Sequence, residues 1–176
     1  SDFDDGVPSL SGIEIYEDGS GGNTIISSGA GTYNGNGGND LIEAGLTTVV
    51  EFEKLDGGGG IDTVDTTSFT GAYALDLATG TTNFGNETAS NFENAITGNG
   101  NDTVDGTGGA NLIESNGGDD VVTGLAGSDT LLGGAGSDSL DGGGGDDSLN
   151  GGNGADRLRA ISGNDTLDGG LDVSND

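Results

Sequence analysis

The sequence predicts an all-β solenoid, in which short strands coil into stacked turns around a thin core. Three observations lead to this fold class. A nine-residue period runs unbroken from Thr97 to Asp168, every unit carries one aliphatic residue at the same position, and the chain is poor in core material. Its 176 residues include 40 glycines and 31 acidic residues, and only 5% are aromatic. A stack of small repeated turns suits this composition better than an ordinary globular core does.

The period is clearest in eight consecutive units, whose fourth residue is always glycine and whose sixth is aspartate except at Asn111. The units are TGNGNDTVD, GTGGANLIE, SNGGDDVVT, GLAGSDTLL, GGAGSDSLD, GGGGDDSLN, GGNGADRLR and AISGNDTLD. Their eighth position is always aliphatic, at Val104, Ile113, Val122, Leu131, Leu140, Leu149, Leu158 and Leu167. One such unit would be weak evidence, but eight in register indicate a repeat architecture.

Each unit divides into a loop of six residues and a strand of three. Because side chains alternate along a strand, position 8 faces one side while positions 7 and 9 face the other. We expect position 8 to point into the core, and polar residues such as Thr103 and Asp105 to point to water. Two units then make one turn, and stacked turns build two parallel sheets. The glycines allow positive φ angles in the loops.

The upstream half is periodic but interrupted. Complete units occur at 35–43 and 57–65, with Asp40 and Asp62 at position 6, and the segment 19–27 has the same shape with Thr24 in that place. We interpret 13–96 as the same coil with longer turns. Val49 and Val50, the stretch 74–77 and Phe92 would supply strands where the motif is missing, and a separate small β domain is the alternative.

The expected organisation has three parts. Irregular solenoid turns with longer loops occupy 1–96, regular nonapeptide repeats occupy 97–168, and a truncated or flexible tail occupies 169–176. Phe69, Tyr73, Phe84 and Phe92 are expected to form a hydrophobic patch in the irregular part.

The net charge of −28 narrows the possible partners. Such a charge opposes compaction by self-repulsion, so a folded chain needs bound cations, and nucleic acid is an unsuitable partner because its phosphates would be repelled. The chain has no cysteine or histidine, which excludes disulfides, thiolate metal sites and the usual activated nucleophiles. We therefore expect no catalytic role. No apolar run is long enough for a membrane helix, and SDFDDGVPSL does not resemble a signal peptide.

The repeat resembles the G-G-x-G-x-D-x-U-x nonapeptide of RTX (repeats-in-toxin) calcium-binding proteins, closely over 97–168 and more loosely over 13–96. The resemblance implies a right-handed parallel β-roll with several calcium ions in the GGxGxD loops. It also implies that loops one turn apart share an ion, so that Asp102 would pair with Asp120 and Asn111 with Asp129.

The side-chain oxygens expected to bind calcium are those of Asp102, Asn111, Asp120, Asp129, Asp138, Asp147, Asp156 and Asp165, with Asp40 and Asp62 upstream. Glycine carbonyls would complete the sites, at Gly98, Gly100, Gly109, Gly118, Gly127, Gly134, Gly136, Gly143, Gly145, Gly152, Gly154 and Gly163. Asn111 offers a neutral oxygen, so its site should be weaker. Asp119 and Asp146 are expected to be surface charges, and Arg157 and Arg159 to balance nearby carboxylates.

Function follows from the small core. One aliphatic side chain per unit cannot offset the entropy of ordering nine residues, so metal binding and folding should be a single event. The resemblance implies a calcium-triggered folding switch and structural scaffold in a secreted bacterial protein, exported by type I secretion. Two alternatives remain: an auxiliary polysaccharide-binding module, as in alginate epimerases, or a segment of an adhesin or surface-layer protein that self-associates, for instance through open solenoid ends.

Overall fold

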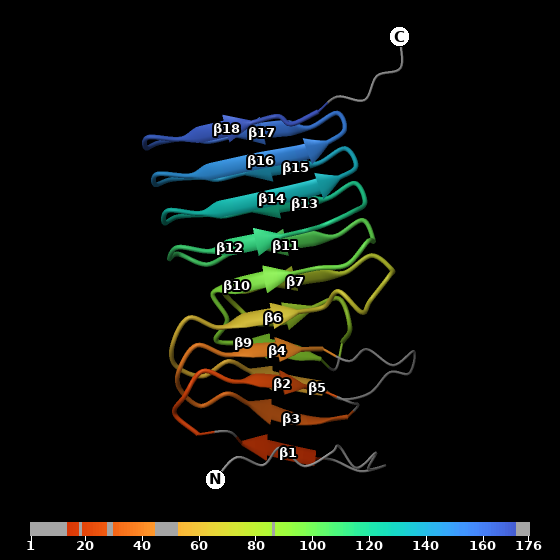
Figure 1. Cartoon of the computed structure of the whole chain (residues 1–176), viewed down its shortest axis with the longest axis vertical. Coiled ribbons are helices and arrows are strands. Elements are labelled where there is room, and N and C mark those ends of the chain that lie inside the picture. The colour runs from red at the N-terminus through yellow and green to blue at the C-terminus, as the bar shows by residue number, and fades with distance from the viewer. Residues whose placement is uncertain (1–13, 18, 28–29, 45–52, 86, 172–176) are drawn as a thin grey trace.

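The computed structural model describes residues 14–17, 19–27, 30–44, 53–85 and 87–171. Within these ranges the chain forms only strands, turns and bends, and no helix that could span a membrane is found there. The strands stack as successive rungs from β1 at one end to β18 at the other, with loops along both edges (Figure 1). The predicted all-β parallel solenoid is confirmed.

The strands belong to two sheets. The ten-stranded sheet has the order β1 (Glu14–Glu17), β3 (Gly31–Asn34), β5 (Glu53–Asp56), β9 (Thr88–Ser90), β8 (Thr81–Thr82), β7 (Ala74–Asp76), β11 (Thr103–Asp105), β13 (Val121–Thr123), β15 (Ser139–Asp141) and β17 (Arg157–Arg159). The eight-stranded sheet has the order β2 (Thr24–Ile26), β4 (Leu41–Glu43), β6 (Thr63–Asp65), β10 (Asn94–Ile96), β12 (Leu112–Glu114), β14 (Thr130–Ala135), β16 (Ser148–Asn153) and β18 (Thr166–Asp168).

The strand register follows the sequence period. From β11 onward, each strand pairs in parallel with the strand two units later, so that Val104 lies beside Val122 and Val122 beside Leu140. The second sheet repeats this spacing, with Ile113 beside Leu131 and Leu131 beside Leu149. Two units therefore make one turn of 18 residues.

The core lies between the two sheets and consists largely of the position-8 side chains. Those from Val104 to Leu149 are at most 1% exposed, and Ile25, Ile42, Val64 and Ala95 continue the row in the upstream turns. The last two members differ: Leu158 is only partly buried and Leu167 is 46% exposed.

A short antiparallel insertion interrupts the coil between residues 74 and 90. Strand β8 lies antiparallel between β7 and β9, while both sheets continue past it, so 14–96 and 97–168 share the same two sheets. The expected strand at 74–77 is present as β7. The prediction of a strand at Phe92 is wrong, because Phe92 lies between β9 and β10, although its side chain is buried. Val49 and Val50 lie outside the described residues.

Aromatic side chains pack around the insertion, where the expected hydrophobic patch is found. Phe69 makes edge-to-face contacts with Tyr73 and Phe84, at ring-centroid distances of 6.0 and 5.0 Å. Tyr73 is 2% exposed, and its hydroxyl donates a hydrogen bond to the buried carboxylate of Glu87. These rings give this part of the coil a thicker core than the regular turns have. The division of the chain at residue 97 stays a prediction.

Candidate metal sites

The position-6 side chains form a ladder of hydrogen bonds along the loop edge that precedes the ten-stranded sheet. One carboxylate oxygen, Oδ1, of each aspartate accepts the backbone N–H of the corresponding residue one turn earlier. Asp120 accepts from Asp102 (N···O 2.7 Å), Asp138 from Asp120 (2.9 Å) and Asp156 from Asp138 (2.9 Å), while Asp102 accepts from Tyr73 (2.8 Å). The structure thus brings together the neighbours that the 18-residue spacing predicts.

The opposite loop edge carries a second ladder, which continues into the upstream turns. Asn111 donates its N–H to Asp129 (2.9 Å), Asp129 to Asp147 (3.0 Å) and Asp147 to Asp165 (3.0 Å). Upstream, Asn23 donates to Asp40 (2.9 Å), Asp40 to Asp62 (2.8 Å) and Asp62 to Oε2 of Glu93 (2.8 Å).

Two members of this second ladder were missed from the sequence. Glu93 occupies position 6 of the unit 88–96, as counting nine residues back from Asp102 would have shown. The unit expected at 19–27 is shifted by one residue: Thr24 pairs with Leu41, a position-7 residue, so Asn23 and not Thr24 stands at position 6.

The second carboxylate oxygen, Oδ2, of most ladder aspartates is buried and has no hydrogen-bond partner. A buried polar atom without a partner is costly, and an ion is one of the few explanations for a repeated set of them. The aspartates concerned are Asp40, Asp62, Asp102, Asp120, Asp129, Asp138, Asp147 and Asp156. The set of unpartnered oxygens thus recurs with the repeat in both the regular and the irregular turns.

In several loops that begin with glycine, a backbone carbonyl from the next turn and the unpartnered Oδ2 lie close to one point. A Cβ placed on Gly124 would lie 2.3 Å from Asp129 Oδ2 and 2.8 Å from the carbonyl oxygen of Gly142. The same point at Gly133 lies 2.4 Å from Asp138 Oδ2 and 2.6 Å from the Gly151 carbonyl. A carboxylate oxygen and a carbonyl oxygen therefore converge on one small space that only glycine leaves open.

The carbonyls of Gly142 and Gly151 belong to position 1 of their units, whereas the predicted glycine ligands are at positions 2 and 4. Several predicted position-2 carbonyls instead accept hydrogen bonds between turns: Gly98 from Gly117, Gly143 from Ile161 and Gly152 from Leu171. Carbonyl oxygen is a normal calcium ligand, so the pairing of Oδ2 with a carbonyl oxygen at Asp129 and Asp138 suits this ion.

The electrostatics of the ladder favour a cation. Burial raises the pKa of Asp120 to about 6, although the N–H of Asp102 and the hydroxyl of Ser115 lower it, and the charges of Asp138 and Asp102 raise it further. Burial likewise raises the pKa of Asp62, Asp129 and Asp138. A divalent ion at the unpartnered oxygens would remove this penalty on ionisation.

Side chains alone do not make a metal cage. Among the residues that the structure describes, no three acidic side chains gather closely enough to hold a metal ion. Any ion at the ladder therefore depends on main-chain oxygens as much as on carboxylates. Mixed carboxylate and carbonyl coordination is typical of calcium, which accepts six to eight oxygens in flexible geometry.

The position-5 residues form two further rows, one on each loop edge, that are more exposed than the ladders. Asn101 Oδ1 accepts the N–H of Asp119 (3.0 Å), Asp119 Oδ1 accepts that of Ser137 (2.8 Å), and Asp146 Oδ1 accepts that of Asn164 (2.8 Å). Asp119 and Asp146 are therefore not merely surface charges, because each also joins two turns.

The expected pairing with carboxylate is found for Arg159, whereas no ion pair of Arg157 occurs among the described residues. Arg159 forms an ion pair with Asp141 on the neighbouring strand (2.7 Å), with both side chains at least partly exposed.

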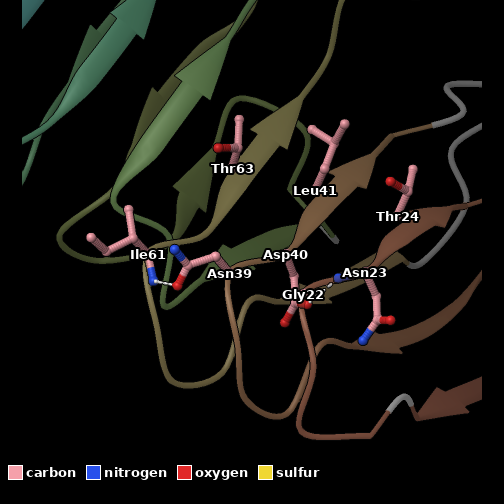
Figure 2. Close-up of a pocket in the computed structure, with 8 residues that line it drawn as sticks. All are labelled: Gly22, Asn23, Thr24, Asn39, Asp40, Leu41, Ile61 and Thr63. Atoms are coloured by element: carbon pink, nitrogen blue, oxygen red, sulfur yellow. Dashed lines mark hydrogen bonds between the residues drawn. The ribbon is translucent and has the colours of Figure 1, made fainter.

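A shallow cavity of about 380 Å³ lies where the loops 19–24, 35–40 and 57–62 stack. Figure 2 shows Asn39 accepting the N–H of Ile61, with Asp40 and Asn23 joined on the neighbouring turn. Thr24, Leu41 and Thr63, the outward residues of three paired strands, line its side.

Fold and loops together define a calcium-binding β-roll, which is a structural module. Comparison with protein families agrees: the RTX calcium-binding nonapeptide repeat, a model of four copies, matches residues 96–131, 123–158 and 150–173. Residues 96–173 therefore match RTX repeats, as the resemblance implied, and this family is typical of secreted extracellular proteins. No match to a curated protein was found.

Proposed function

We propose that the chain is a calcium-triggered folding module, which is disordered at low calcium and forms the β-roll when calcium binds at the ladder aspartates. The observation that carries this proposal is the row of buried Oδ2 atoms without partners, several of which, such as those of Asp129 and Asp138, share a small space with a carbonyl from the next turn. Metal ligation would satisfy these atoms and neutralise the repulsion within a chain of net charge −28.

The proposed ligands are the predicted position-6 aspartates together with loop carbonyls, with position 1 now added to the predicted glycines. An ion held by Asp129 and the carbonyl of Gly142 would join two turns, because these residues belong to successive turns. Each ion would then stabilise the contact between its two turns as well as its own loop.

The biological role that suits this behaviour is a scaffold in a secreted protein. Extracellular calcium modules bind with dissociation constants of about 10⁻⁴–10⁻³ M, so cytosolic calcium would leave the chain unfolded and extracellular calcium would fold it. Export by type I secretion is the route that the RTX repeats suggest.

Far-ultraviolet circular dichroism during calcium titration tests the proposal, with EDTA to reverse it and magnesium as the control ion. We expect a cooperative change from coil to β structure with a midpoint near millimolar calcium, and little response to magnesium, which prefers rigid octahedral sites. A chain that is fully β-structured in EDTA, or one that stays disordered at 10 mM calcium, would overturn the proposal.

A further inference from the structure

The loop 106–111 differs in backbone conformation from the regular loops that follow it. In the five loops between 115 and 156, positions 2 and 4 have positive φ angles, as at Gly143 (+86°) and Gly145 (+131°). No residue of 106–111 has a positive φ, although three of the six are glycine, and the loop 97–102 before it shares this conformation. The loop that contains Asn111 is therefore built differently from the loops that contain Asp120 to Asp156.

Hydrogen bonds to Thr107 in the same loop and to Glu93 one turn earlier satisfy the side-chain amide of Asn111. Its Oδ1 accepts the N–H of Thr107 (2.8 Å) and lies 3.2 Å from the Thr107 hydroxyl. Its Nδ2 donates to the carbonyl of Glu93 one turn earlier (2.5 Å) and lies 2.9 Å from the same hydroxyl. Asn111 is 4% exposed, and both polar atoms of its amide have partners.

The contrast with Asp129, one turn later on the same edge, is direct. Asp129 leaves its Oδ2 buried and without a partner, whereas Asn111 leaves no such atom. The carbonyl oxygen of Gly124 and Asn111 Oδ1 do approach one point, at 2.7 and 2.6 Å from a Cβ placed on Gly106. A cation there would have to displace Thr107 from Oδ1, and the neutral amide would offer no charge in return.

We infer that the loop 106–111 binds no calcium and that the contacts of Asn111 with Thr107 and Glu93 hold this turn in place of an ion. The inference rests on the proposed calcium-binding function and refines it. The calcium array on this edge is then divided into an upstream group at Asp40 and Asp62 and a downstream group from Asp129 to Asp165. Asn111, expected to be a weak ligand, becomes an internal cross-link.

Counting the calcium ions bound per chain by equilibrium dialysis at saturating calcium tests the inference. We expect Asn111→Ala to bind as many ions as the unmodified chain, and the matched variant Asp129→Ala to bind one fewer. The double variant Thr107→Gly, Asn111→Asp converts the loop to GGGGAD and should gain one ion, which keeps the test decisive if Asn111→Ala does not fold.

Loss of one ion in Asn111→Ala, or no gain in the double variant, would overturn the inference while leaving the calcium-binding function standing. An unmodified chain that binds no calcium would overturn both. Thr107→Val provides a further readout: removal of the hydroxyl should weaken the turn and raise the calcium midpoint of folding without changing the number of ions.

Discussion

Replacement of Asp120 by asparagine should stabilise the metal-free fold and at the same time weaken its response to calcium. Asparagine keeps the oxygen that accepts the N–H of Asp102, but it removes the buried negative charge. The variant therefore separates the hydrogen-bonding role of the side chain from its proposed role as a ligand. The two effects have opposite signs, which makes the prediction specific.

Both magnitudes can be worked out from the structure. The pKa of Asp120 is raised from 3.8 to about 6, mainly by burial, so ionisation at pH 7.5 costs the metal-free fold on the order of 1–3 kcal/mol after solvent screening. One calcium site contributes about 2.7 kcal/mol at a hundredfold excess over its dissociation constant. Asp120→Asn should therefore be more stable than the unmodified chain in EDTA and should gain less stability on addition of calcium.

The assay measures folding under two conditions at pH 7.5. An osmolyte titration in EDTA gives the stability of the metal-free fold, and urea unfolding in excess calcium gives that of the metal-bound fold. Asp146→Asn is the matched control, because it removes the same charge from an exposed side chain and should change either value by less than about 0.5 kcal/mol. A variant that is destabilised in EDTA, or that keeps the full calcium increment, would refute the reasoning.

Three further predictions concern the core, the glycines and pH. Leu131→Ala should lower the free energy of unfolding in calcium by about 2–5 kcal/mol, because Leu131 is fully buried, whereas Leu167→Ala, at a 46% exposed position, should cost less than about 1 kcal/mol in urea unfolding. Gly145→Ala should abolish calcium-induced circular dichroism of the regular turns, since φ is +131° and a Cβ would lie 1.7 Å from the Gly127 carbonyl oxygen, whereas Gly169→Ala, in open space, should fold normally. Because the pKa of Asp120 is raised from 3.8 to about 6, the metal-free fold carries a proton between these pH values that the unfolded chain lacks. Its stability in EDTA should therefore rise as pH falls from 7 to 5. With calcium present, protons compete for the same carboxylate, so the calcium midpoint of folding should rise over that pH range; a midpoint that falls would contradict this assignment.

The regular turns could be predicted from sequence because each unit repeats the same local information. Position 8 fixes which face is buried, and a constant spacing then fixes the register, as the pairing of Val104 with Val122 shows. The irregular turns lack this constancy. A loop of different length shifted the unit at Thr24 by one residue, and Glu93 lacks the glycine-rich motif, so only its spacing of nine residues from Asp102 distinguishes it from an ordinary surface acid.

The site was predictable in residue type but not in atomic detail. The period correctly identified which aspartates lie one turn apart, such as Asp120 and Asp138. Which oxygen of each carboxylate is already engaged, and which carbonyl approaches the other, depends on how neighbouring turns stack. The difference between Asn111 and Asp129 likewise depends on Thr107, whose contact with the amide only the folded loop reveals.

The direction of the hydrogen bonds has a mechanical consequence. The ladder bonds and the backbone bonds of both sheets join one turn to the next, along the direction in which the rungs stack in Figure 1. A force pulling the two ends of the array apart therefore loads the turns in series, and the weakest interface opens first. Each opened turn of 18 residues would release about 60 Å of extended chain from a rung about 4.8 Å high. Under load the array would lengthen in equal steps of one turn, with the force of each step set by the calcium bound there.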